Sequence, residues 1–178
     1  MLEGLLYVVA ALVVAVGMLL VVASLRPDSF RVERSMEMAA APDRIYPEIA
    51  DLRAMNTWNP FVDPDPAIQI TYSGPEAGRG AVHTWKGNRH VGEGRLEILD
   101  ATAPSRLDMR LQMFKPFKAD NAVAFTLAPT GAGTRVTWAM SGRQPLMAKL
   151  MSMFINCDRM VGGQFEKGLG TLKAKVEA

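Results

Sequence analysis

Hydrophobic and polar positions follow two different patterns along this chain. Residues 4–25 contain no charged side chain and are dominated by Leu and Val. A helix rises about 1.5 Å per residue, so this stretch would span roughly 33 Å, more than the hydrocarbon core of a bilayer at about 30 Å. Beyond Leu25, charged side chains are frequent. The pattern predicts a transmembrane anchor in residues 1–26 and one globular domain in residues 27–178.

A cleaved signal peptide is an alternative interpretation of the apolar stretch, because Val21, Val22 and Ala23 loosely match a small-residue cleavage site. Two features favour an anchor that stays attached. The uncharged run is longer than the apolar region of a signal peptide, about 7–15 residues, and no Lys or Arg precedes it. A buried helix of a soluble core is the third interpretation.

The charges beside the apolar stretch predict its orientation. Glu3 is the only charged side chain before it, whereas the arginines that follow closely are Arg26, Arg31, Arg34 and Arg44. Cytoplasmic segments next to a span carry an excess of Lys and Arg. We therefore expect a single-pass membrane protein with its globular domain in the cytoplasm.

The globular domain is expected to begin with a strand and two short helices. In residues 30–38 apolar and polar side chains alternate, which is the period of a half-buried strand. Pro42 followed by Asp43 is typical of a helix start, and apolar residues then recur at helical spacing over about ten positions. A second short helix is expected from near Arg53 and should end before Pro60, because the residue before a proline avoids helical backbone angles.

Strand-like runs dominate the middle of the chain, and each is closed by Gly or Pro. They are residues 68–73, 81–86, 92–101, 106–113, 121–129 and 133–141. Their connections are short, which favours antiparallel neighbours joined in a meander.

The end of the chain returns to a helical period. Apolar side chains recur every three or four positions, so we expect one long helix over residues 145–175. Gly162 and Gly163 interrupt it, and each helical glycine costs about 1 kcal/mol relative to alanine. A close approach to a strand, a kink or room for a bound molecule would explain them. The expected stripe is Leu146, Leu150, Phe154, Cys157, Val161, Phe165, Leu169, Leu172 and Val176.

Together these elements predict an α+β fold, in which a curved seven-stranded antiparallel sheet wraps around the long C-terminal helix. One transmembrane helix precedes it. The short helices are too small to fill the space inside such a sheet. A cavity between the sheet and the C-terminal helix is therefore expected.

Several short segments stand in a distinctive order along the domain. They are residues 41–46 (APDRIY), 51–52 (DL), 58–60 (WNP), 92–95 (GEGR), 133–138 (GTRVTW) and 165–169 (FEKGL). These segments and their order resemble the START/Bet v 1-like superfamily, often called the polyketide cyclase/dehydrase and lipid-transport family. The resemblance covers residues 30–177. It implies a helix-grip fold around a hydrophobic pocket, in a family of carriers, sensors and a few enzymes, and it assigns no catalytic residues.

Composition and charge exclude some classes of function. The formal net charge is +2, which lacks the strongly basic footprint of a typical nucleic-acid binder, so no nucleic-acid partner is expected. Cys157 is the single cysteine, and the two histidines are His83 and His90. These residues are too few for a cysteine zinc site or a His-rich metal centre, and no metal or other cofactor is expected.

Aromatic and thioether side chains are the candidates for lining the expected pocket, because they give apolar walls that conform to irregular guests. His83 lies mid-strand, and Asp158 is expected either to hydrogen-bond a ligand or to neutralise a buried arginine. Ordinary core packing remains the alternative for the apolar candidates. The candidate ligand-binding residues are Trp58, Tyr72, His83, Trp85, Met109, Met113, Phe125, Trp138, Met140, Phe154 and Asp158.

Three functions remain open. The first is a membrane-anchored domain that binds a hydrophobic small molecule or lipid in the cavity, with the membrane contacted through residues 4–25. The second is a cyclase- or dehydratase-type enzyme acting on an apolar carbonyl substrate, with His83 or Asp158 transferring the proton. The third is a protein-interaction domain next to the membrane with a collapsed cavity.

Overall fold

One antiparallel sheet organises the part of the chain that the computed structural model describes, residues 2–62, 65–154 and 156–178. The strand order is β1-β7-β6-β5-β4-β3-β2, so β2 to β7 form a meander and β1 closes beside β7. The predicted seven-stranded antiparallel sheet is confirmed. Its strands are β1 (Ser29–Met38), β2 (Gln69–Ser73), β3 (Val82–Lys86), β4 (Glu93–Thr102), β5 (Arg106–Lys115), β6 (Ala119–Thr130) and β7 (Gly133–Arg143).

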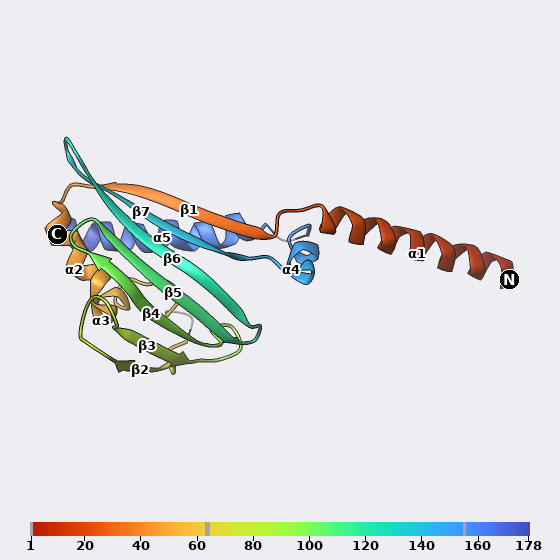
Figure 1. Ribbon diagram of the computed structural model, residues 1–178, viewed down its shortest axis with the longest axis horizontal. Helices are drawn as coiled ribbons and strands as arrows, with labels where there is room; N and C mark the ends of the chain where they lie inside the picture. Colours follow the sequence, from red (N-terminus) through yellow and green to blue (C-terminus); the bar gives the residue numbers. More distant parts are fainter. Residues whose placement is uncertain (1, 63–64, 155) are drawn as a thin grey trace.

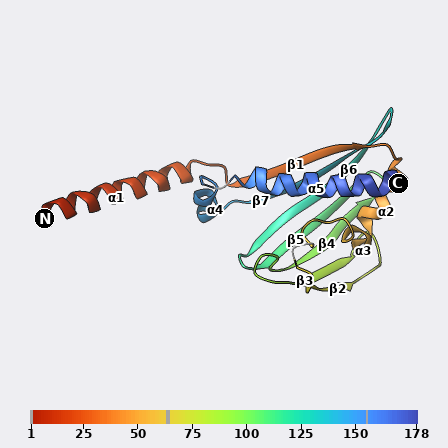
Figure 2. The same ribbon diagram turned by 180° about the vertical axis from the view of Figure 1, so that it is seen from behind.

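The sheet bends around the last helix, α5 (Cys157–Glu177), as Figures 1 and 2 show. This helix lies against β1 and β7. Phe165, Leu169 and Leu172 face the sheet and are fully buried, because they recur at helical spacing on one side of α5. The predicted α+β fold, with a curved sheet that grips its C-terminal helix, is confirmed.

Two short helices close the end of the sheet that is remote from α1 (Figure 1). They are α2 (Pro42–Ala50) and α3 (Leu52–Met55). Asp51 separates them, and its carboxylate accepts a hydrogen bond from the backbone N–H of Arg53 at 2.7 Å, which caps α3. Ile49 of α2 is fully buried, so these helices complete the core at this end.

The prediction of one helix over residues 145–175 is wrong. The structure has a short helix, α4 (Leu146–Met151), before α5. Asn156 starts the second helix, because its side-chain Oδ1 accepts a hydrogen bond from the backbone N–H of Arg159 at 2.9 Å. Residue 155 lies outside the described part of the chain.

The break between α4 and α5 changes the buried stripe. Phe165, Leu169 and their neighbours further along α5 are buried as predicted. Leu146, Phe154 and Cys157 are exposed, because they precede the part of α5 that packs on the sheet. The apolar spacing in the sequence continues through residues 146–157, although the N-cap residue Asn156 starts a new helix there.

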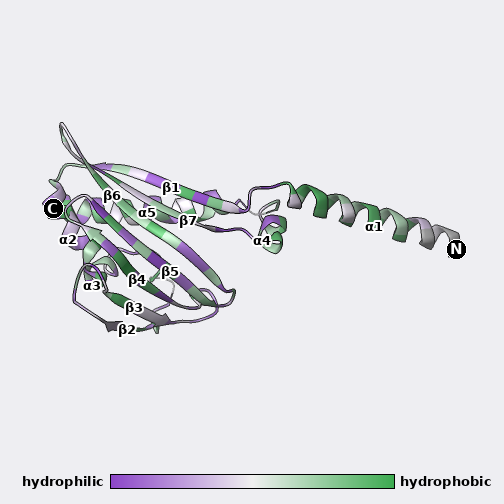
Figure 3. Cartoon of the chain, in the orientation of Figure 1, coloured by the Kyte–Doolittle hydropathy of each residue, from purple (hydrophilic) through white to green (hydrophobic). Residues whose placement is uncertain are grey.

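The N-terminal helix, α1 (Leu2–Ser24), projects away from the sheet (Figure 1), and apolar residues cover it (Figure 3). Its stretch Tyr7–Ser24 is long and apolar enough to cross a membrane, and 6% of that stretch is buried. The low burial distinguishes α1 from the core helix of a soluble protein. A signal sequence shares its length, composition and position, so the structure supports a membrane span by length and composition alone.

Candidate ligand-binding site

Aromatic side chains fill the middle of the interface between the sheet and α5. Trp138 of β7 stacks on Phe165 of α5 with ring centroids 4.1 Å apart, and Phe125 of β6 lies 5.0 Å from Trp138. Trp58, which follows α3, meets Phe125 and Trp138 edge-on. Gly168 permits this packing, since a Cβ there would lie 2.9 Å from the Trp138 ring. Side chains therefore occupy the place where the sequence predicted a cavity.

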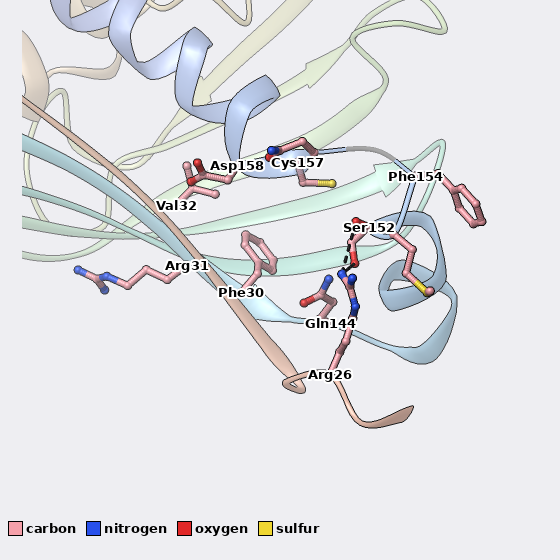
Figure 4. Close-up of a pocket in the computed structure, with 11 residues that line it drawn as sticks. Arg26, Phe30, Arg31, Val32, Gln144, Ser152, Phe154, Cys157 and Asp158 are labelled. Atoms are coloured by element: carbon pink, nitrogen blue, oxygen red, sulfur yellow. Dashed lines mark hydrogen bonds between the residues drawn. The ribbon is translucent and has the colours of Figure 1, made fainter. Parts of the chain in front are cut away.

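A hollow of about 480 Å³ opens at the other end of the same interface (Figure 4). It lies between the start of β1, the end of β7 and the connection from α4 to α5. Its volume falls within the range of small-molecule sites, roughly 300–1,000 Å³. The residues that line it are Arg26, Phe30, Arg31, Val32, Gln144, Ser152, Met153, Phe154, Asn156, Cys157 and Asp158.

The lining of the hollow combines apolar side chains with polar ones and includes two arginines, of which Arg31 pairs with Glu33. Phe30 and Val32 contribute from β1, where alternate residues share a face, and Met153 contributes from the α4–α5 connection. The Arg26 guanidinium donates hydrogen bonds to the Ser152 side chain at 3.2 Å and to its carbonyl oxygen at 3.5 Å. No carboxylate in the described residues pairs with Arg26. The hollow can therefore accept an apolar body and an acidic group.

Asp158 lines the hollow, but its carboxylate is already engaged. Arg34 of β1 donates to Asp158 Oδ2 at 3.0 Å and to Glu166 Oε1 at 2.8 Å. The hydrogen bond from Arg34 lowers the pKa of the Asp158 carboxyl, which is therefore ionised at neutral pH. Of the two roles expected for Asp158, the structure shows the one that neutralises an arginine.

Gly162 explains part of the interruption in the last helix. The Arg34 guanidinium lies against it, and a Cβ at this position would overlap with that group. The expected close approach of a strand is thus confirmed at Gly162, through a side chain of β1. A Cβ at Gly163 would meet open space, and no contact in the described structure explains this glycine.

A second polar cluster lies away from the hollow, on β2 and β3. The Asn56 amide donates to Tyr72 Oη at 2.8 Å and lies 3.0 Å from Nδ1 of His83, which is 4% exposed. Burial lowers the pKa of His83 to about 4, so its imidazole is neutral at pH 7. The Trp85 ring lies 5.4 Å from His83, and the Arg53 guanidinium covers Tyr72 at 4.1 Å. The cluster is a wall of the core that contains a neutral histidine, and Oδ1 of Asn56 is buried there without a hydrogen-bond partner among the described residues.

The structure separates the eleven candidate ligand-binding residues into three groups. Phe154 and Asp158 line the hollow. Tyr72, His83 and Trp85 meet in the polar cluster. Their role in binding, like that of the others, stays a prediction. Of the remaining six, five lie in the core or pack against it and Met113 is half-buried on β5; the six are Trp58, Met109, Met113, Phe125, Trp138 and Met140.

Most of the lining of the hollow was missed from sequence. In the sequence, Arg26 indicates only the topology of the membrane span, and Phe30 and Val32 are ordinary inward positions of an alternating strand. Asn156 carried a usable signal, because Asn is a favoured N-cap and Asp158 follows in the first helical turn. Reading that cap would have placed the helix break, and with it the opening, at the correct position.

Metal ligands are not gathered at either place. Across the described ranges, no three His, Cys, Asp or Glu side chains are close enough to hold a metal ion. Cys157 is a free, exposed thiol at the start of α5.

Residues 29–177 match the model of one protein family, described as polyketide cyclase / dehydrase and lipid transport. The chain belongs to this family. The match spans every strand of the sheet and all of α5, and it begins just after α1. No protein of curated function matches the sequence significantly.

Solved structures place this family member among proteins of the same fold. Protein CV1439 of Chromobacterium violaceum is 18% identical, with a TM-score of 0.58 and coverage of 85% of this chain and 99% of that one. Ara h 8.0201 is 14% identical, with a TM-score of 0.56 and coverage of 82% and 99%. DynU16, a protein of the dynemicin biosynthetic locus, is 16% identical, with a TM-score of 0.56 and coverage of 86% and 48%. At these identities the likeness establishes the fold and no activity.

Proposed function

We propose that this polyketide cyclase / dehydrase and lipid transport family member is a membrane-anchored domain that binds a hydrophobic small molecule or lipid. The observation that carries the proposal is the hollow of about 480 Å³ between β1 and the α4–α5 connection. Apolar side chains form part of its wall, it lies beside the end of α1, and it remains open while aromatic side chains fill the middle of the interface. The family description, which includes lipid transport, supports the same class of ligand.

The proposed anchor is residues 1–26, and the proposed binding domain is residues 27–178. In this proposal α1 spans the bilayer once. The arginines that follow it, with Arg26 and Arg31 nearest, keep the domain on the cytoplasmic side. An anchored domain samples apolar molecules at the high concentration found in a bilayer, which suits a binding site that opens next to the membrane.

The proposal is tested by asking whether a bound molecule leaves when the hollow is blocked. Cys157 lines the hollow and is the single cysteine, so a bulky maleimide can fill the site without any substitution. Native mass spectrometry of the full chain, released from detergent, should show co-purified apolar molecules on the untreated protein. The same measurement after labelling should show them lost.

Cys157→Ser treated with the same reagent is the matched control, and it should keep its bound molecules. Retention of the same molecules by the labelled protein would contradict binding in the hollow. Empty protein in every preparation would contradict the binding function itself.

An enzyme of the cyclase or dehydratase type is the alternative that the family leaves open. His83 is the residue that favours it, because a buried neutral imidazole can donate a hydrogen bond to a carbonyl oxygen. The described lining of the hollow does not include His83, and Asp158 is ion-paired. His83→Ala and Asp158→Asn should abolish turnover without unfolding if the alternative holds. The aromatic side chains that fill the middle of the interface between the sheet and α5 instead support the third function, a protein-interaction domain next to the membrane.

A further inference from the structure

The segment that includes α4 exposes large apolar side chains beside α1. We define the α4 segment as residues 146–154. Met147 and Met151 are four residues apart and share a face of the helix. Contiguous exposed apolar side chains on a folded domain mark an interaction surface. The exposed fractions are 46% for Leu146, 69% for Met147, 46% for Met151 and 76% for Phe154.

The α4 segment is fixed to the end of α1 rather than hanging on a free linker. Ala23 of α1 is fully buried, and α1 contacts α4. Arg26 bonds to Ser152 of the segment. Asp28 accepts a hydrogen bond from the backbone N–H of Gln144 at 2.7 Å, and its carboxylate pairs with the buried Lys149 of α4 at 2.6 Å. The position of α1 therefore determines the position of the segment.

We propose that the α4 segment lies in the surface of the same bilayer that α1 spans, an inference that rests on the anchoring proposed above. Figure 1 shows α4 directly beside the domain end of α1. With α1 across the bilayer, the exposed side chains of Met147, Met151 and Phe154 come to the depth of the lipid headgroups. Apolar side chains stabilise such a position by entering the boundary of the acyl region.

The charges around the α4 segment fit an anionic lipid surface. Arg143 precedes the segment, Arg159 follows it and Arg26 bonds to it, and all three side chains are exposed. Each Lys or Arg close to an anionic bilayer surface is attracted to it. The apolar surface also lies beside that of α1, which is exposed over residues 7–22. These two features favour the bilayer over a second copy of the chain as the occupant.

The consequence is that the hollow opens toward lipid. Ser152, Met153 and Phe154 belong both to the α4 segment and to the lining of the hollow. A segment seated in the interface therefore places one wall of the hollow at the headgroups. An apolar ligand can then pass between bilayer and hollow without crossing water.

Spin labels on the full chain in vesicles test this orientation. The background is Cys157→Ala, and the vesicles contain phosphatidylcholine and phosphatidylglycerol. Met147→Cys carries the label on the α4 segment, Leu12→Cys carries it inside α1, and Gly131→Cys carries it in the β6–β7 turn at the remote end. A Cβ at Gly131 meets open space, so that label does not disturb the fold. The readout is collision with oxygen, which concentrates in lipid, against collision with a water-soluble nickel complex.

The expected result is a several-fold higher oxygen-to-nickel collision ratio at residue 147 than at residue 131, with residue 12 higher still. A lipid-exposed residue 12 with residues 147 and 131 equally aqueous would overturn the inference and leave the anchor intact. An aqueous residue 12 would instead overturn the anchoring on which the inference rests. A label at residue 147 shielded from both reagents and broadened by a neighbouring label would assign the surface to a second copy.

A charge change in the surface gives a second test. Met151→Glu combined with Phe154→Glu, in the background labelled at residue 147, should lower the collision ratio at 147 toward the aqueous value, because both carboxylates stay in water. Leu99→Glu is the matched control, since Leu99 is exposed on β4 and outside the segment. It should leave the ratio unchanged. An equal ratio in all three proteins would contradict a seat in the interface.

Discussion

The two ends of α5 meet the same sheet in different ways. In the filled half, Phe165 and the buried residues that follow it pack against Trp138 and the sheet. In the open half, over the first turns of α5, contact with β1 is made by Arg34, which reaches Asp158 and Glu166 across Gly162. The hollow lies beside this ionic contact. The filled half is therefore expected to supply stability, and the proposed binding site lies at the opposite end of the same helix.

The largest effect is expected in the filled half. Trp138→Ala should lower the free energy of unfolding by about 3–5 kcal/mol, because it removes a large buried ring and leaves a cavity. The indole N–H of Trp138 has no hydrogen-bond partner among the described residues, so the loss measures packing alone. Denaturant unfolding of the full chain in detergent, followed by far-UV circular dichroism, measures the change.

Phe154→Ala is the control from the open half. Its ring is exposed, so the free energy of unfolding should change by no more than about 0.5 kcal/mol. Equal destabilisation by the two substitutions would show that the two halves do not differ in packing, and would end the comparison.

The buried histidine of the polar cluster on β2 and β3 should make stability depend on pH. Burial lowers the pKa of His83 to about 4 in the folded protein, from about 6.5 for a histidine in the unfolded chain. Between those values the unfolded chain binds the extra proton, so stability falls as pH falls from about 6.5 to about 4, by about 3 kcal/mol in total. His83→Gln should flatten the unfolding free energy in this window. The exposed His90, changed to Gln, is the control; a flat profile in the unmodified protein would contradict the burial of His83.

The open half should discriminate between ligands by their head groups. Arg26→Gln should weaken the binding of a long-chain fatty acid roughly tenfold, because hydrogen bonds to charged groups are worth about 1.5–3 kcal/mol. It should leave the fatty alcohol of the same chain length unaffected. Native mass spectrometry titrations of the full chain measure both. An equal loss for acid and alcohol would show that Arg26 only packs against Ser152.

The fold was predictable from sequence because each element carries a local signal that the tertiary structure obeys. The alternation in β1 and the helical stripe from Phe165 to Val176 both appear in the structure with the expected faces. The break between α4 and α5 was the exception. There the apolar spacing continues across Asn156. The N-cap at this single residue, a weaker sequence signal than the spacing, determines where α5 begins.

The site was harder to predict, for a physical reason. Trp138 and Phe125 are large, aromatic and inward-facing, which is equally true of a pocket wall and of a filled core. The sequence does not show whether two inward-facing rings contact each other or line an open pocket. Arg26 and Phe30 come together with Ser152 only through the joint between α1 and the domain, a long-range contact without a local pattern.

The smallest expected effect tests how the Arg34 side chain of β1 holds the start of α5. Gly163→Ala meets open space, so it should gain helix propensity and stabilise the protein by up to about 1 kcal/mol. Gly162→Ala gains the same propensity, but its methyl group displaces the Arg34 guanidinium from Asp158 and Glu166. These ion pairs are partly exposed, so their loss offsets only part of the gain in helix propensity, and Gly162→Ala should be less stable than Gly163→Ala. The difference in stability between the two variants should disappear in an Arg34→Ala background, because the methyl group at residue 162 then displaces no guanidinium. If Gly162→Ala remained less stable than Gly163→Ala without Arg34, backbone packing, and not the ion pairs, would set the distance between α5 and β1.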